Sequence, residues 1–129
     1  MTEPVWVDLE VALAIHDEQL AEHGGQAGVR DRGLLESAMG RPMNQFAYGE
    51  HSLARLAASY AFGISRNHPF LDGNKRTSLV VAELFLVLNG LELTSNDTET
   101  VATFLQLAAG EFTEEALADW IEANATAVR

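Results

Sequence analysis

The sequence contains no cysteine, which excludes disulfides and thiolate-ligated metal sites. It is also poor in positive charge, with 8 lysine and arginine residues against 19 aspartates and glutamates and a net charge of -11. Because nucleic-acid binding depends on basic residues that meet phosphates, this balance argues against DNA or RNA as a partner. The longest apolar run, residues 79–88, is too short for a membrane span and contains Glu83. We therefore expect no membrane association.

The first residues contain neither the basic nor the apolar segment of an export signal. Together with the absence of cysteine, this predicts a cytoplasmic protein. A length of 129 residues and a hydrophobic content of 47% predict one domain, spanning residues 1–129, that can bury a core.

Apolar residues recur mainly at helical spacing, and the alternation typical of strands is scarce. The pattern predicts a mainly helical, all-α fold of about six helices. The expected helices cover residues 8–23, 31–40, 52–67 and 74–89, followed by two around residues 101–108 and 113–121.

Residues 74–89 carry apolar side chains on all sides, which predicts that this helix is central and wrapped by the others. Gly40 and Pro42 are expected to end the second helix. In the segment that follows, residues 41–50, Phe46 and Tyr48 alternate in a way that indicates a short flap or hairpin.

The most informative segment is residues 68–76, His-Pro-Phe-Leu-Asp-Gly-Asn-Lys-Arg. It places the only lysine of the chain, Lys75, next to Arg76 at the expected start of a helix. Two cations at a helix N-terminus are unfavourable by about 0.3–1 kcal/mol each. A bound anion would offset this cost, because helix N-termini with cationic side chains bind phosphate well. Alternatively, Asp72 only caps the helix and both cations point into solvent.

The other residues of the segment supply complementary chemistry. His68 is a candidate general base, because its pKa is naturally near neutrality. Phe70 is expected to be a buried anchor of the loop. Asp72 offers a carboxylate oxygen of the kind that Mg²⁺ prefers. Gly73 permits close backbone approach to an anion, and Asn74 would complete an anion-holding nest.

A base, a metal carboxylate, a backbone cradle and two cations are together what transfer of a phosphoryl or nucleotidyl group requires. The cations differ in their use, since Lys75 acts as a point charge and Arg76 can bind phosphate through two bonds. His16 and His23 lie outside this segment and are expected to be structural.

The segment resembles the signature of Fic proteins, His-Pro-Phe-x-Asp-Gly-Asn-Gly-Arg-x-x-Arg, and more closely the death-on-curing (Doc) branch, in which Asn-Lys-Arg follows the glycine. The similarity extends over most of the chain, from Trp6 to the helix that enters the motif. It implies a helical Fic-type fold, ATP and Mg²⁺ as co-substrates, and modification of a hydroxyl on a target protein. It also implies His68 as base, Asp72 as Mg²⁺ ligand, and Gly73, Asn74, Lys75 and Arg76 as phosphate-binding residues.

Two departures from the wider Fic pattern bear on the reaction. Lys75 replaces the second glycine of the motif, and Leu79 stands where the second arginine would be. The resemblance then implies that ATP presents its γ-phosphate, giving a kinase-type toxin whose target is translation elongation factor Tu. An adenylyltransferase is the alternative enzyme, and a catalytically silent binding module is the alternative from another class.

Many Fic proteins carry an inhibitory helix with the pattern Ser/Thr-x-x-x-Glu-Gly/Asn. No glutamate in this sequence is followed by glycine or asparagine. The resemblance therefore implies a separate antitoxin that inserts into the active-site groove. Phe46 and Tyr48 of the expected flap are candidates for positioning the target.

Overall fold

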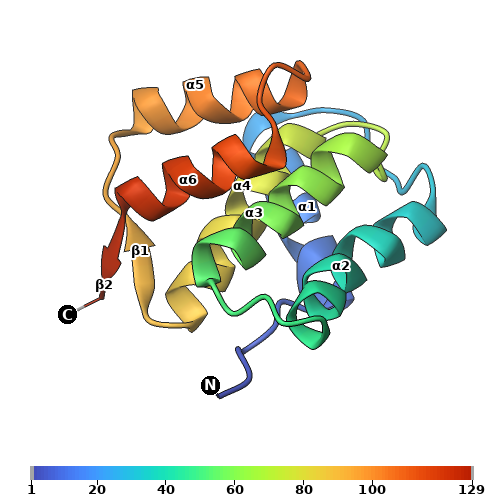
Figure 1. Cartoon of the computed structure of the whole chain (residues 1–129). Coiled ribbons are helices and arrows are strands. Elements are labelled where there is room, and N and C mark those ends of the chain that lie inside the picture. Colours follow the sequence, from blue (N-terminus) through green and yellow to red (C-terminus); the bar gives the residue numbers. More distant parts are fainter. Residues whose placement is uncertain (1, 129) are drawn as a thin grey trace.

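The computed structural model describes residues 2–128, and within them six α-helices account for most of the chain (Figure 1). The all-α, mainly helical fold expected from the sequence is confirmed. The helices are α1 (Leu9–His23), α2 (Arg32–Ala47), α3 (Leu53–Asn67), α4 (Asn74–Leu88), α5 (Asp97–Ala108) and α6 (Glu114–Asn124).

Five of these helices begin at a side chain that caps them. In each, a side-chain oxygen accepts a hydrogen bond from the backbone N–H three residues later, which satisfies one of the free donors of the first turn. The capping residues are Asp8, Asp31, Ser52, Asn96 and Thr113. The remaining helix, α4, has no side-chain cap.

A buried central helix is present, but it is α3 rather than α4. Helix α3 packs against α2, α4 and α6 and is buried over most of its length (Figure 1). Small residues permit this close packing, since a Cβ on Gly63 would lie 3.3 Å from the Cα of Ala38 on α2. Helix α4 buries one face and leaves Val87 52% exposed. The sequence pattern pointed to α4 because alanine and glycine contribute little apparent hydrophobicity to α3.

The predicted flap at residues 41–50 is wrong, because α2 continues through Pro42 to Ala47. A proline inside a helix costs roughly 3 kcal/mol. Here the ring of Pro42 is buried, and Phe46 one turn later packs edge-on against Trp6, with ring centroids 5.7 Å apart. These packing contacts offset the lost backbone hydrogen bond, so neither Gly40 nor Pro42 ends the helix.

Strand structure lies elsewhere in the chain. Strand β1 (Leu91–Leu93) pairs antiparallel with β2 (Ala125–Ala127), with Leu91 opposite Ala127. This short ribbon ties the connection after α4 to the segment after α6 (Figure 1). Among residues 2–128, no helix has both the length and the apolar character needed to cross a membrane.

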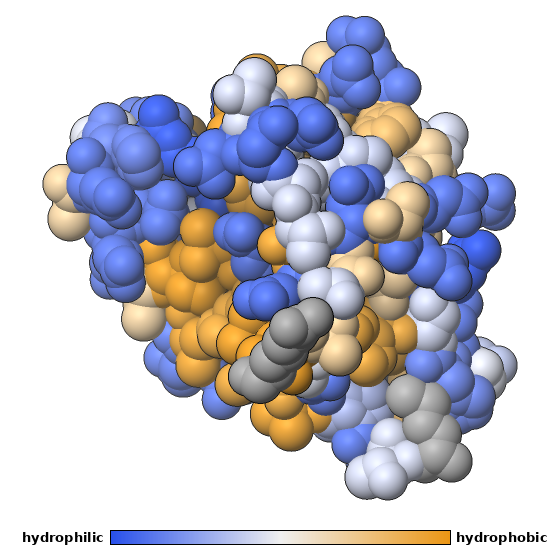
Figure 2. Space-filling view, turned by 90° about the vertical axis from the view of Figure 1, so that its left-hand side faces the viewer, coloured by the Kyte–Doolittle hydropathy of each residue, from blue (hydrophilic) through white to orange (hydrophobic). Residues whose placement is uncertain are grey.

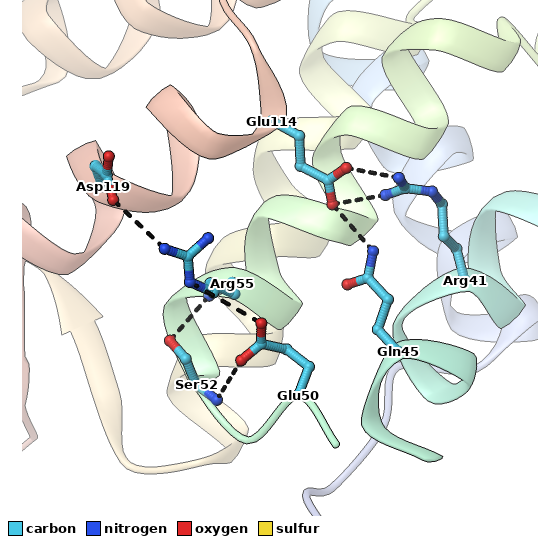
Figure 3. A network of polar contacts seen from close by, with 7 residues as sticks. All are labelled: Arg41, Gln45, Glu50, Ser52, Arg55, Glu114 and Asp119. Carbon is cyan, nitrogen blue, oxygen red and sulfur yellow. Dashed lines mark hydrogen bonds and ion pairs between the residues drawn. The ribbon is translucent and has the colours of Figure 1, made fainter. Parts of the chain in front are cut away.

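A polar network joins α2 to the start of α6 (Figure 3). The guanidinium of Arg41 donates two hydrogen bonds to the carboxylate of Glu114, at 2.7 and 2.6 Å, and Gln45 donates a third. Burial would raise the pKa of Glu114, but these hydrogen bonds outweigh burial and hold the pKa below its ordinary 4.5. The ion pair therefore stabilises the folded state while Glu114 is ionised.

We expect Glu114→Gln to lower the free energy of unfolding by about 1 kcal/mol at neutral pH, because the pair is partly exposed. Since the folded-state pKa is lowered, the difference from wild type should be complete above pH 4.5 and vanish as pH falls through that lowered pKa. Urea unfolding at several pH values measures it. Glu115→Gln, an exposed carboxylate in the same helical turn, is the matched control and should change little. An equal loss in both variants would show that the Arg41 pair contributes nothing.

Candidate active site

Seven of the nine residues of the 68–76 segment line one pocket of about 310 Å³. It is lined by His68, Leu71, Asp72, Gly73, Asn74, Lys75 and Arg76, and by Ala108 at the end of α5. A larger hollow of about 520 Å³ lies between the end of α2 and the start of α6 and contains none of these residues. The chemistry of the lining, rather than the size, therefore identifies the smaller pocket as the candidate site.

The two residues assigned to a target-positioning flap are not at this pocket. Tyr48 is 93% exposed and lines the larger hollow, and Phe46 packs against Trp6 and His51. Their proposed contact with a target stays a prediction.

His68 follows the last residue of α3 in a left-handed conformation, with φ 48° and ψ 55°. It is the only non-glycine residue with positive φ among residues 2–128. Such a conformation costs on the order of 1–2 kcal/mol. Arg30 stabilises it, because its guanidinium donates to the carbonyl oxygens of His68 and Asn67 at 2.7 and 2.8 Å. The histidine is thus held in a strained position at the mouth of the pocket.

Asn74 closes the loop around Phe70. Its side-chain oxygen accepts from the N–H of Phe70 at 3.0 Å, and its NH₂ group donates to the carbonyl of Phe70 at 2.9 Å. These bonds fix which amide atom is nitrogen, so it is Nδ2 of Asn74 that lies 3.3 Å from Nδ1 of His68 and can donate its second proton to it. The neutral imidazole then carries its proton on Nε2. Because this contact is long, it restrains the ring of His68 only weakly.

The N-terminus of α4 is open to the pocket. Gly73 stands at the N-cap position with φ 80°, and no side chain caps the helix. Asp72, expected as a possible cap, instead accepts a hydrogen bond from the N–H of Gly73 at 2.8 Å through Oδ1. The free N–H groups of the first turn and the exposed side chains of Lys75 and Arg76 therefore face the same space. This is the arrangement that binds a phosphate.

The carboxylate of Asp72 is exposed and held by two backbone N–H groups. Besides the bond to Gly73, Oδ2 accepts from the N–H of Gln26 at 3.2 Å. The hydrogen bonds from Gln26 and Gly73 lower the pKa of Asp72 below its ordinary 3.8, so the side chain stays ionised. Each oxygen keeps lone-pair capacity, as metal binding requires.

No cluster of three potential metal ligands occurs among residues 2–128. A single carboxylate, that of Asp72, nevertheless fits Mg²⁺, because this ion binds through one or two carboxylates and takes water and substrate phosphates as its other ligands.

The segment before α2 braces the motif, which the sequence did not reveal. Val29 pairs with Phe70 in an antiparallel bridge, and Leu71 donates from its N–H to the carbonyl of Gly28 at 3.1 Å. Gly25 adopts φ 124°, and a Cβ there would lie 2.9 Å from Oδ2 of Asp72. The glycines of this segment are the signal that could have indicated close approach of two backbones.

His16 on α1 supports the motif from the other side. It is 2% exposed, and its ring stacks on Phe70 at 3.8 Å between centroids. Phe70, the expected anchor, is 1% exposed. The motif loop is therefore fixed by groups from α1, from the segment before α2, and from its own Asn74.

Comparison with known proteins agrees with this geometry. A model of the Fic/DOC family matches residues 6–86. The chain is 35% identical over 111 residues to a protein of Escherichia phage P1 named protein kinase doc, covering 85% of this chain and 87% of that relative. It is 42% identical over 76 residues to a protein of Mycolicibacterium smegmatis named toxin Doc, covering 57% of this chain and 58% of that relative. The motif, the helices that carry it and both similarities show that this chain belongs to the Fic/DOC family.

Proposed function

We propose that this chain is the toxin of a toxin–antitoxin pair and acts as a protein kinase. It transfers the γ-phosphate of ATP to a hydroxyl of a translation factor, with elongation factor Tu as the expected target. The observation that carries the proposal is the uncapped N-terminus of α4, which faces one pocket together with Lys75, Arg76, Asp72 and His68. The printed names of the two relatives, a protein kinase and a toxin, support it.

Each residue has a distinct part in the reaction. The N–H groups of the first turn of α4 and the guanidinium of Arg76 bind phosphate oxygens, and Lys75 adds a point charge. Asp72 holds Mg²⁺, which when bound neutralises charge on the phosphates. His68 accepts the proton of the target hydroxyl as its oxygen bonds to the γ-phosphorus and the bond to the departing ADP breaks. Growth arrest follows from the modified factor.

Lys75 and Leu79 favour phosphoryl over adenylyl transfer. Lys75 brings an ammonium where the wider Fic pattern has a glycine, so phosphates are drawn to a place that adenylylating relatives leave empty. Leu79, half-buried one turn further along α4, offers no guanidinium to clamp ATP in the other orientation. Adenylyl transfer is the second candidate, and a silent binding module is the third.

The mass added to the target distinguishes the three candidates. Purified protein incubated with ATP, Mg²⁺ and elongation factor Tu should add about 80 Da, against about 329 Da for adenylyl transfer and nothing for a silent module. His68→Ala is the control and should reduce the rate by about 10²- to 10⁴-fold, the usual contribution of a general base. An addition of about 329 Da, or full activity in folded His68→Ala, would contradict the proposal.

Asp72→Asn tests the metal. The amide keeps the shape and the acceptor for the N–H of Gly73 but loses the charge, so Mg²⁺-dependent ATP binding should weaken by more than about tenfold. Calorimetric titration with ATP at several Mg²⁺ concentrations measures this. Asp119→Asn removes one exposed carboxylate from α6 and should leave binding unchanged. If ATP binding by Asp72→Asn depends on Mg²⁺ as strongly as in wild type, the carboxylate does not bind the metal and its role is structural.

An antitoxin partner fits the surface beside the site. Figure 2 views the side of the molecule that lies to the left in Figure 1, where the β1–β2 ribbon is, and hydrophobic side chains gather on that face. The surface proposed for the antitoxin is a separate stripe, on α5. On α5, Val101 and Leu105 are 49% and 45% exposed, and Ala108 continues their helical stripe to the pocket lining. Such a stripe suits an apolar face of a partner segment that reaches the pocket. The partner would restrain the enzyme by covering His68 and Arg76.

Expression of the chain alone in bacteria should therefore arrest growth, and co-expression with the antitoxin should restore it. Growth curves after induction measure both effects, and His68→Ala should be harmless without a partner. Leu105→Glu should weaken rescue, because a buried charge opposes binding of an apolar segment. Glu99→Gln, an exposed change on the same helix, should not. Normal growth during high expression of the unmodified chain would argue against a toxin.

A further inference from the structure

His16 is a buried titratable residue that the proposed reaction does not use. Its Nε2 lies 2.8 Å from the main-chain carbonyl oxygen of Asp72. A carbonyl oxygen only accepts hydrogen bonds, so Nε2 must carry a proton and donate it. The flat stack on Phe70, at 8° between ring planes, fixes the direction of this donor. Helix α1 thus reaches the motif through one hydrogen bond and one ring contact.

The bond to Asp72 sets the orientation of a whole peptide unit. The carbonyl of Asp72 and the N–H of Gly73 belong to one trans peptide, so they point in opposite directions. With the carbonyl held toward α1, the N–H of Gly73 points away from α1, where it donates to Oδ1 of Asp72 at 2.8 Å. The hydrogen bond from His16 to the carbonyl of Asp72 thereby orients the N–H of Gly73, which in turn holds the carboxylate of Asp72.

Gly73 itself does little to resist rotation of the Asp72–Gly73 peptide. Glycine adopts either sign of φ at similar cost, so its backbone does not oppose rotation of the peptide that precedes it. The next peptide is fixed separately, because the N–H of Thr77 donates to the carbonyl of Gly73 at 3.0 Å. The ring of His16 lies directly beneath, 3.4 Å from where a Cβ of residue 73 would be. Within the loop the Asp72–Gly73 peptide is held only through the bond from the N–H of Gly73 to Oδ1 of Asp72, and His16 restrains its carbonyl from outside the loop.

We propose that His16 is a positioning residue of the active site, and that its Nε2–H locks the Asp72–Gly73 peptide so that the Asp72 carboxylate and the start of α4 keep their phosphate-binding geometry. The activity part of this inference rests on the proposed function. Its structural part, the orientation of the peptide, stands independently of which group is transferred.

Two substitutions separate the hydrogen bond from the ring contact. His16→Phe keeps a ring against Phe70 and removes the donor. His16→Gln removes the ring and keeps an N–H group equally far along the side chain. His23→Phe, at the exposed end of the same helix, is the matched control.

We expect kcat for phosphoryl transfer to fall about 10- to 100-fold in His16→Phe, as for other residues that orient a metal ligand, with the KM for the target protein unchanged. His16→Gln should recover most of kcat, and His23→Phe should match wild type. A His16→Gln variant as impaired as His16→Phe would overturn the proposal, because the ring contact would then be what matters.

Nuclear magnetic resonance tests the peptide without any assay of activity. The amide of Gly73 should exchange with solvent faster in His16→Phe than in wild type and be restored in His16→Gln. In wild-type protein, which needs no variant to fold, imidazole ¹⁵N shifts should show a proton on Nε2 of His16. A neutral ring protonated only on Nδ1, or unchanged Gly73 exchange in His16→Phe, would overturn the proposal. A wild type that transfers no phosphate but shows the expected exchange pattern would instead reject the kinase function alone.

Discussion

Burial of Phe70 is the constraint on which the candidate site depends. The buried ring stacks on His16. The side chain of Asn74 hydrogen-bonds to both the N–H and the carbonyl of Phe70. A buried backbone group without a partner would cost about 1–3 kcal/mol, so Asn74 makes the buried anchor possible. With Phe70 fixed, the loop has little freedom on either side of it. His68 before it and Asp72 after it both line one pocket.

The same constraint explains why α4 begins without a cap. The side chain of Asn74 does not cap the helix, because it is hydrogen-bonded to the backbone of Phe70. The carboxylate of Asp72 does not cap it either, because it accepts from the N–H groups of Gly73 and Gln26. The first turn of α4 therefore keeps free donors, next to two cations that a helix N-terminus disfavours. Both features oppose folding locally and favour an anion. Such conflict between local preference and observed structure is typical of functional sites, where binding rather than folding decides the residues.

The positions of most helices could be predicted from the sequence, because they depend on short-range patterns. The predicted helix starts at residues 8, 31, 52 and 113 coincide with the capping residues of the structure, because capping is a local interaction. The errors arose where distant contacts override local preference. Pro42 did not end α2, because the burial of its ring and the packing of Phe46 on Trp6 compensate. The supports of the motif, from His16 and from Arg30, join residues far apart in the chain and leave no local signal.

The charge of the chain has a further consequence for the site. A net charge of -11 repels a free nucleotide, yet at physiological salt fields between exposed charges fade over about 8 Å. An anion in the pocket therefore responds mainly to Lys75, Arg76 and the open end of α4, while the distant carboxylates have little effect. Asp72 is the exception, because it lies inside that range and is held ionised. A phosphate would bind beside this carboxylate with least repulsion if a cation lay between them, which is why the proposed function requires a metal-bound nucleotide rather than a free one.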